Sequence, residues 1–288
     1  IRRLVNKSTG VDMEYKMDMG LTGKRALVTG SSAGLGRAIA EMLAEEGASV
    51  VVHGRDPDRT RAVAAGIGGD AVAALGDLST AEGADSVARQ AGEVDILVNN
   101  AGILRDAAFK NMTADQVDAV VAVHLTGAFN VTRAVWPTMR EQNYGRIIQT
   151  TSGTGLFGNF GQANYGAAKL GLVGLINTLA QEGAKYNIKT NAVAPIAATR
   201  MTQDILPPEV FEKLTPEYVA PVVAYLMTEE LPDTDSIFIV GGGKVQRTAL
   251  FQNEGITFGD VPSVDDVAAK WGEITDLSAA QQASFKLG

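Results

Sequence analysis

Short apolar runs alternate along the chain with longer segments that have the periodicity of amphipathic helices. The runs are rich in Val, Ile, Leu and Ala and apolar along their whole length, which is typical of parallel strands buried on both faces. They predict strands at residues 25–29, 49–53, 71–75, 95–98, 146–151, 190–194 and 236–240. Helices are predicted from the glycine-rich stretch at 30–36 to residue 48 and at 58–65, 84–92, 113–139, 165–186 and 264–271. The alternation predicts an α/β fold in which helices cover both faces of a parallel sheet.

The same pattern divides the chain into one domain and two terminal segments. Residues 21–245 contain no linker-like stretch and no internal repeat, so we interpret them as a single domain. Residues 1–20 begin without Met and show no clear periodicity, and we predict a tail that is disordered or of artificial origin. The pattern weakens after residue 245, and residues 246–288 are expected to form a C-terminal extension with one short helix.

Composition excludes several kinds of site. The 288 residues include no Cys and two His, His53 and His124, so a disulfide, a thiol nucleophile and a Cys- or His-rich metal centre are ruled out, and we predict no metal. The net charge of −8 disfavours a nucleic-acid partner. No apolar run approaches the ~20 residues that a membrane helix needs. We therefore expect a cytoplasmic protein that does not bind a membrane.

Gly30, Gly34 and Gly36 lie between the first predicted strand and the first predicted helix. Because glycines have no side chain, a pyrophosphate can approach the backbone of such a turn and the helix N-terminus, where free N–H groups and the helix dipole favour anions. The spacing is Gly-x-x-x-Gly-x-Gly. The alternative is a tight turn whose glycines serve packing only, but its place after the first strand of an alternating chain favours a dinucleotide site.

The end of the second predicted strand is expected to contact the adenosine ribose. An acidic residue there accepts a hydrogen bond from the 2′-hydroxyl of NAD, whereas an Arg favours the 2′-phosphate of NADP. The chain has Gly54 at the expected place of the acid and Arg55 next to it. This favours NADP(H), with NAD(H) as the alternative. Asp77, after the third strand, suits the adenine amino group or, alternatively, caps a helix.

The segment 152–169 contains the candidate acid–base chemistry. Tyr165 and Lys169 lie four residues apart, so on a helix they share one face. A nearby cation is expected to lower the pKa of the phenol, and Tyr165 could then exchange a proton with a substrate oxygen that Ser152 hydrogen-bonds. The alternative is a half-buried aromatic and a solvated lysine, and Tyr-x-x-x-Lys alone is too common to decide.

Together these motifs resemble the short-chain dehydrogenase/reductase family over residues 21–245. The resemblance rests on Thr29-Gly30-x-x-x-Gly34-x-Gly36, Asn99-Asn100-Ala101-Gly102, Ser152, Tyr165-x-x-x-Lys169 and Asn191 to Pro195. It implies a doubly wound, Rossmann-type, seven-stranded parallel sheet and catalysis by Ser152, Tyr165 and Lys169. The cofactor residues that it implies are Gly30, Ser32, Gly34, Leu35, Gly36, Arg55, Asp77, Leu78, Asn100, Ala101, Gly102, Tyr165, Lys169, Pro195 and Thr199.

From about residue 99 onward, the runs at 99–106, 123–129 and 158–165 also make the chain resemble two narrower groups. These are the (3R)-hydroxyacyl-CoA dehydrogenase part of peroxisomal multifunctional enzyme type 2 and the bacterial 3-oxoacyl-carrier-protein reductases. The likeness implies an oxidoreductase that interconverts a ketone and a secondary alcohol in an acyl thioester, carried by CoA or acyl-carrier protein. A steroid or other lipophilic ketone is the alternative substrate. A dinucleotide-sensing protein without catalysis is the alternative from another class.

The resemblance also implies a role for His124 and an assembly. His124 lies where the family usually has an Asn that anchors a water in a proton relay, and the multifunctional enzymes also tend to have His there, so His124 is a further catalytic candidate. Ile196 follows Pro195 in place of the family's usual Gly. By analogy, helices near 113–139 and 165–186 form a four-helix interface in a homodimer or homotetramer.

Overall fold

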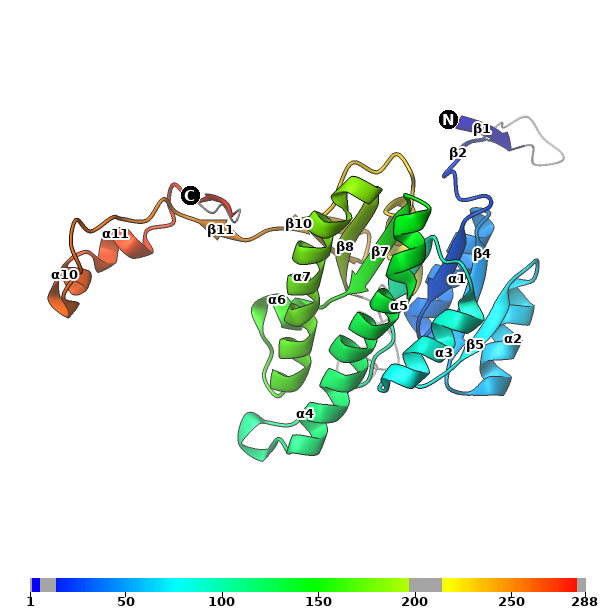
Figure 1. Ribbon diagram of the computed structural model, residues 1–288, viewed down its shortest axis with the longest axis horizontal. Helices are drawn as coiled ribbons and strands as arrows, with labels where there is room; N and C mark the ends of the chain where they lie inside the picture. The colour runs from blue at the N-terminus through cyan, green and yellow to red at the C-terminus, as the bar shows by residue number, and fades with distance from the viewer. Residues whose placement is uncertain (1, 6–13, 197–213, 284–288) are drawn as a thin grey trace. The chain divides into compact units, whose positions relative to one another are not determined.

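The computed structural model describes residues 2–5, 14–196 and 214–283, which form two compact units, 1–246 and 247–288. The first unit is built on an eight-stranded sheet of order β10-β9-β8-β7-β6-β3-β4-β5 (Figure 1). Its strands are β3 (Arg25–Val28), β4 (Ser49–Gly54), β5 (Val72–Leu75), β6 (Ile96–Asn99), β7 (Gly145–Thr150), β8 (Ile188–Pro195), β9 (Ser236–Gly241) and β10 (Lys244–Thr248).

The strands from β3 to β9 pair in parallel and correspond to the predicted ones. The predicted number of strands is wrong by one, because β10 adds an eighth at the edge of the sheet. This strand reads Lys-Val-Gln-Arg-Thr and is mostly exposed, so it lacks the apolar signal of the buried strands. It follows β9 through Gly242 and Gly243, which both have positive φ.

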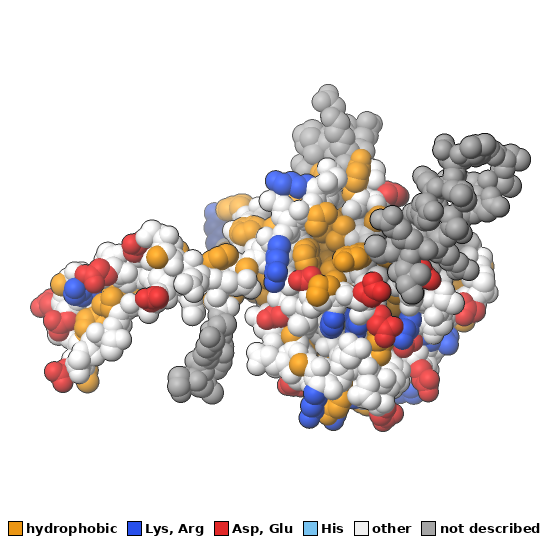
Figure 2. Space-filling view, turned by 90° about the horizontal axis from the view of Figure 1, so that it is seen from above, with side chains coloured by type: hydrophobic (Ala, Val, Ile, Leu, Met, Phe, Trp, Pro, Cys, Tyr) orange, Lys and Arg blue, Asp and Glu red, His pale blue; other side chains and the backbone are white. Residues whose placement is uncertain are grey.

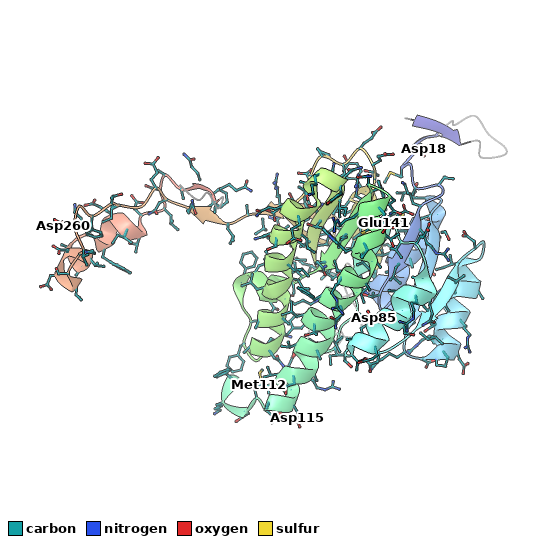
Figure 3. All side chains as sticks on the ribbon, viewed as in Figure 1. Asp18, Asp85, Met112, Asp115, Glu141 and Asp260 are labelled. Atoms are coloured by element: carbon teal, nitrogen blue, oxygen red, sulfur yellow. The ribbon has the colours of Figure 1, made fainter. Side chains whose placement is uncertain are left out.

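Helices and helical turns connect the strands. They are α1 (Gly34–Glu45), α2 (Pro57–Ile67), α3 (Ala81–Ala91), η1 (Phe109–Asn111), α4 (Ala114–Val121), the π-helical segment η2 (Ala122–Thr126), α5 (Gly127–Glu141), α6 (Gly153–Phe157), α7 (Ala163–Gly183), η3 (Ala184–Tyr186), η4 (Pro216–Tyr218) and α9 (Ala220–Tyr225). Thr113 and Gln116 form a capping box at the start of α4, and Asp115 places a carboxylate in its first turn (Figure 3).

Alternate residues of the central strands face opposite layers of helices. Ala26 and Val28 of β3 belong to a core cluster with α1 and α9, whereas Leu27 belongs to a second cluster with α3 and α5. A third, smaller cluster joins α7 to β8 and β9. Both faces of the sheet are therefore buried, which explains why its strands are apolar throughout.

The connection order creates a switch point between β3 and β6. From β3 the chain continues to β4 and β5 on one side, and β6 lies on the other side of β3 (Figure 1). Loops at the carboxyl ends of such neighbouring strands diverge and leave a crevice, where ligands of doubly wound sheets bind. Thr29 and Asn100 lie at this point.

The terminal segments differ from their prediction in detail. In the expected tail, β1 (Arg2–Val5) pairs antiparallel with β2 (Glu14–Met17), so the tail contains regular structure. The second unit contains β11 (Phe251–Gln252) paired with β12 (Gln281–Gln282), α10 (Val264–Ala269) and α11 (Trp271–Thr275). The single helix predicted at 264–271 is therefore two short ones.

Acidic and basic side chains are intermixed on the face of the first unit that Figure 2 shows. Within the described ranges, no helix is both long and apolar enough to cross a membrane. The same residues include no group of three or more His, Cys, Asp or Glu side chains that could hold a metal ion.

Candidate active site

The turn after β3 is held to the end of β6 through one threonine. Thr29 Oγ1 accepts hydrogen bonds from the N–H groups of Asn100 (2.9 Å) and Ala101 (3.1 Å) and lies 3.3 Å from the carbonyl of Val98, to which it donates. The Asn100 side chain donates back to the carbonyl of Thr29 at 3.1 Å. These bonds fix the two loops that border the switch point.

Glycines line this turn because the backbones approach closely. Gly30 has φ +66°, and a Cβ there would lie 2.8 Å from Ala101 Cα. A Cβ at Gly36 would lie 2.4 Å from Asn100 Nδ2. No side chain caps the N-terminus of α1, so the N–H groups of its first turn remain available. This concave, uncapped helix start fits the diphosphate of a dinucleotide.

Arg55 and Asp77 lie together next to this turn. Their closest charged atoms are 3.9 Å apart, and their side chains are 68% and 50% exposed. The Ser79 N–H donates to Asp77 at 3.0 Å, which is the main reason why the pKa of Asp77 is lowered. The structure thus brings these two separately predicted residues together at the surface, where an adenosine group could reach them.

The candidate catalytic side chains come from β7 and α7. Ser152 follows β7 and caps α6, accepting a hydrogen bond from the Thr154 N–H at 3.1 Å. Its hydroxyl lies near enough to the phenol of Tyr165 to favour the ionised phenol and so to lower the Tyr165 pKa. The Lys169 Nζ lies 5.6 Å from the centroid of the Tyr165 ring and donates to the carbonyl of Thr150. The predicted cluster of Ser152, Tyr165 and Lys169 is present.

The predicted lowering of the Tyr165 pKa is wrong for the chain alone. Burial of the phenol raises its pKa, and the hydrogen bond from Ser152 offsets this only in part. Burial also lowers the pKa of Lys169 to about 7, so at neutral pH the lysine carries only part of its charge. In this state desolvation outweighs the attraction between phenolate and ammonium.

His124 lies in the π-helical segment η2, with its ring edge-on to Tyr165 at a centroid distance of 5.1 Å. Its Nε2 lies 2.9 Å from the N and 2.7 Å from the O of Ile103, whereas the buried Nδ1 has no partner. Burial, with Lys169 nearby, lowers the pKa of His124 to about 3, so the imidazole is neutral at pH 7. A single hydrogen on Nε2 or Nδ1 satisfies only one of the two Ile103 contacts.

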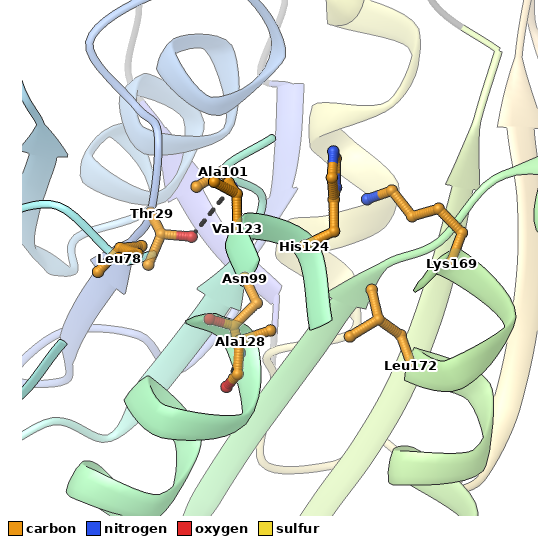
Figure 4. A pocket seen from close by; sticks show the side chains of 9 residues that line it. All are labelled: Thr29, Leu78, Asn99, Ala101, Val123, His124, Ala128, Lys169 and Leu172. Atoms are coloured by element: carbon orange, nitrogen blue, oxygen red, sulfur yellow. Dashed lines mark hydrogen bonds between the residues drawn. The ribbon is translucent and has the colours of Figure 1, made fainter. Parts of the chain in front are cut away.

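His124 and Lys169 also line a narrow cavity, where the lysine amine points towards the imidazole (Figure 4). The cavity is lined by Thr29, Leu78, Asn99, Ala101, Val123, His124, Ala128, Lys169 and Leu172. The buried Asn99 Oδ1 has no partner either. The space between these side chains is too small for a water molecule, so the two atoms are buried without a partner in the described part of the chain.

A second set of polar side chains ties the segment after β6 to the segment between Ser152 and Tyr165. Gln162 donates to Asp106 at 2.7 Å and accepts from Thr154 Oγ1 at 3.0 Å. The Ala107 N–H donates to the Gly161 carbonyl at 2.9 Å. Phe157 and Phe160 of the same region are 70% and 89% exposed, so the loop offers apolar surface beside the catalytic cluster.

The other predicted residues have mixed outcomes. Ser32 and Gly102 lie in the loops that border the switch point, Leu35 lies buried in the first turn of α1, and Pro195 ends β8. Thr199 lies outside the described residues. The sequence did not assign a role to Thr29 or Asn99, although both stand inside quoted motifs. Their signal is a polar residue directly at the end of an apolar strand.

Comparisons with known proteins find relatives that match most of the chain. The family described as "short chain dehydrogenase" matches residues 24–209. A short-chain type dehydrogenase/reductase of Mycobacterium tuberculosis is 60% identical over 284 residues, which cover 93% of this chain and 99% of that protein. A 3-oxoacyl-[acyl-carrier-protein] reductase of Synechocystis is 39% identical over 242 residues, which cover 78% of this chain and 98% of the reductase.

A similar solved structure is that of full-length peroxisomal multifunctional enzyme type 2 from Drosophila melanogaster. The TM-score is 0.78 and the sequence identity 39%, and the match covers 92% of this chain and 47% of that one. The chain therefore spans about half the length of that multifunctional enzyme.

Proposed function

The chain belongs to the short-chain dehydrogenase family and is an oxidoreductase, and we propose that it interconverts a ketone and a secondary alcohol with NADP(H). The observation that carries this proposal is the cluster of Ser152, Tyr165 and Lys169 beside the glycine-lined turn. A dinucleotide-sensing protein would need the turn alone, so the three side chains favour an enzyme.

Each member of the cluster has a step in the proposed reaction. When bound, the nicotinamide ring donates or accepts the hydride. In the direction of reduction, Tyr165 donates its phenolic proton to the ketone oxygen while the Ser152 hydroxyl hydrogen-bonds that oxygen. The raised pKa keeps Tyr165 protonated at neutral pH, as a proton donor must be. The ammonium form of Lys169 stabilises the phenolate that remains.

Arg55 and Gly54 support NADP(H) over NAD(H). The exposed Arg55 guanidinium can pair with a 2′-phosphate. A Cβ at Gly54 would lie 2.3 Å from Thr60 Oγ1 and 2.9 Å from Ser32 Oγ. Thr60 is fully buried and donates to the Asp56 carbonyl at 2.6 Å, so it resists displacement. A carboxylate that would bind the 2′-hydroxyl of NAD is therefore disfavoured at position 54.

For the substrate we propose a 3-oxoacyl or 3-hydroxyacyl thioester of CoA or acyl-carrier protein. Support comes from the name of the Synechocystis reductase, 98% of which is covered by the match to this chain. The exposed Phe157 and Phe160 offer apolar surface for an acyl chain. A steroid or other lipophilic ketone would use the same surface and is the alternative.

We propose that His124 acts as a positioning residue at the cavity beside Lys169. With the hydrogen on Nε2 donated to Ile103, Nδ1 keeps a lone pair and can act only as a hydrogen-bond acceptor. A proton donated by an imidazolium is not part of the proposal, since the pKa of His124 is about 3. A cytoplasmic location and a homodimer or homotetramer stay predictions.

The test is a side-by-side measurement of NADPH and NADH oxidation with acetoacetyl-CoA. We expect kcat/KM to favour NADPH by about tenfold or more, since the 2′-phosphate gains a charged partner. Arg55→Asp should move the preference towards NADH. An unchanged ratio of the two kcat/KM values would remove Arg55 from this role.

Tyr165→Phe tests the acid–base assignment. Turnover should fall by about 10²–10⁴-fold, the usual worth of a positioned proton donor, while the Kd of NADPH changes little. Tyr186→Phe is the matched control, because Tyr186 lies away from the cluster and bonds Arg140. Retained activity in Tyr165→Phe would contradict the assignment. If the protein binds NADPH tightly but no ketone causes NADPH oxidation, the dinucleotide-sensing alternative is favoured. If only bulky ketones cause NADPH oxidation, the steroid or lipophilic-ketone alternative is favoured.

A further inference from the structure

His53 is a buried histidine that the catalytic cluster does not use. It lies near the end of β4 and is 3% exposed. Its Nδ1 accepts a hydrogen bond from the Gly30 N–H at 2.9 Å, and its Nε2 lies 3.1 Å from the carbonyl of Gly76. An N–H can only donate and a carbonyl can only accept, so the ring carries its hydrogen on Nε2. Both ring nitrogens are thus satisfied by backbone groups.

The backbone of His53 holds the same turn. Its N–H donates to Ser31 Oγ and its carbonyl accepts from the Ser31 N–H, both at 2.9 Å. Ser31 Oγ in turn donates to the carbonyl of Val28 at 2.6 Å. The turn after β3 is therefore fixed to the end of β4 by backbone and side chain together.

The other end of the ring reaches a different part of the crevice. Gly76 follows β5 and directly precedes Asp77, whose carboxylate faces Arg55. One imidazole therefore joins the loops after β3 and β5, which lie on either side of β4 in the sheet. The first loop leads into the uncapped start of α1, and the second contains the exposed charged pair.

The backbone of Gly30 is confined on two sides, and the His53 ring provides one of them. Its φ of +66° and the 2.8 Å approach of a Cβ to Ala101 Cα confine it on the β6 side. The imidazole confines it on the β4 side and satisfies its N–H. Loss of the ring would leave that N–H without its partner, and the turn would shift to find another.

We propose that His53 is a positioning residue of the dinucleotide site, whose neutral imidazole sets the spacing between the Gly30 turn and the Asp77–Arg55 pair. The inference rests on the dinucleotide site proposed above. With the spacing fixed, the N-terminus of α1 and the Arg55 guanidinium can meet the diphosphate and the adenosine phosphate of one ligand at the same time. Such preorganisation raises affinity, because less ordering is needed on binding.

The proposed role requires that the His53 imidazole is neutral. A doubly protonated ring would set a second N–H against the Gly30 N–H. Burial lowers the pKa of His53, and Arg55 lowers it further, whereas the Gly76 carbonyl and the Asp77 carboxylate oppose this. The net effect is a neutral ring at neutral pH.

Amide isosteres separate the two bonds of the ring. His53→Asn places an amide oxygen near the position of Nδ1 and keeps an acceptor for Gly30. His53→Gln places an amide nitrogen near the position of Nε2 and keeps a donor for Gly76, and His53→Leu keeps neither. Gln90→Leu is the matched control, because Gln90 bonds both the N–H and the carbonyl of Leu75 on β5 without touching the Gly30 turn.

The experiment measures the Kd of NADPH and of 2′-phospho-ADP-ribose by calorimetry at pH 7.5, with kcat at saturating NADPH and Tm for each full-length variant. We expect His53→Leu to weaken both ligands by about tenfold, the order expected for one buried hydrogen bond, while kcat stays within about threefold of the parent. His53→Asn should recover most of the affinity and His53→Gln less. Gln90→Leu should lower Tm and leave both Kd values unchanged.

Wild-type Kd values in His53→Leu, with a lowered Tm, would overturn the proposal and leave His53 a stabilising residue only. If His53→Leu does not fold, the two amide variants decide, and wild-type Kd values in both would overturn it. A parent protein that binds neither NADPH nor NADH would overturn the dinucleotide proposal and this one with it. Weakening confined to the His53 variants supports both.

Discussion

The Lys169 amine is buried without a carboxylate at ion-pair distance in the part of the chain that the structure describes. Its side chain is 3% exposed, and burial lowers its pKa from 10.5 to about 7. A group with a lowered folded-state pKa resists protonation in the folded chain but not in the unfolded one. Between pH 7 and 10.5 the unfolded chain therefore binds the proton more tightly, and stability rises with pH.

Lys169→Met should therefore stabilise the protein while abolishing turnover. The gain should be largest below pH 7, where the folded parent must bury a charge, and should shrink as pH rises towards 10. The difference between 10.5 and about 7 sets an upper bound of about 5 kcal/mol. Urea unfolding at pH 6, 8 and 10 measures the trend. Lys185→Met, at an exposed lysine, is the control and should show no such pH dependence.

At the scale of single residues, the sequence predicted which side chains form the candidate site better than it predicted their pKa values and hydrogen-bond partners. The proximity of Ser152, Tyr165 and Lys169 followed from residue types in the spacing of the resembled family. The direction of the Tyr165 pKa shift and the role of His53 did not, because both depend on burial by segments distant in sequence. His53 accepts from a residue 23 positions earlier and lies against one 23 positions later, and no local pattern records such a contact.

At the scale of elements, the helical stretch from α4 to α5 contains a feature that the apolar periodicity of the sequence did not predict. The sequence predicted one continuous helix, and the structure has a π-helical segment within it at 122–126. That segment carries His124 beside Tyr165. A π-helical segment is about one turn long and has no residue signature of its own, so the sequence did not reveal it. The edge strand β10 was missed for the opposite reason, since it has no apolar face to detect.

The start of α4 offers a test at the scale of one element. Thr113→Ala removes the side chain that accepts from the Gln116 N–H at 3.3 Å and ends the capping box. We expect a loss of about 1 kcal/mol in the free energy of unfolding. Ser263→Ala removes the corresponding capping box of α10 in the second unit and should leave the unfolding of the first unit unchanged. Equal effects of the two variants on that transition would contradict the assignment.

For the whole molecule, α5 and α7 lie side by side and expose large apolar side chains (Figure 1). Phe129 of α5 and Leu170 of α7 are 51% and 48% exposed, and Val117 of α4 is 36% exposed. A Cβ at Gly171 of α7 would lie 3.1 Å from the Leu125 side chain, which shows how closely α7 packs against η2. An exposed apolar surface of this kind is expected at a subunit interface.

Leu170→Glu should therefore break the predicted homodimer or homotetramer. A carboxylate on this surface would be buried without a partner on association, which costs several kcal/mol. Light scattering at micromolar concentration measures the mass, and Val72→Glu, at a partly exposed position on the edge strand β5, is the control. A parent protein that is already monomeric would rule out the interface.

The contact between Gly102 and His124 has a consequence for how this site can change in evolution. A Cβ at residue 102 would lie 2.3 Å from His124 Cε1, so the two positions are not independent. A lineage that first exchanges His124 for a smaller residue opens room for a side chain at 102, whereas the reverse order passes through a collision beside Tyr165. Divergence of this pair is therefore easier when residue 124 changes first, and recombination between relatives that differ at both positions is tolerated best when the two are inherited together.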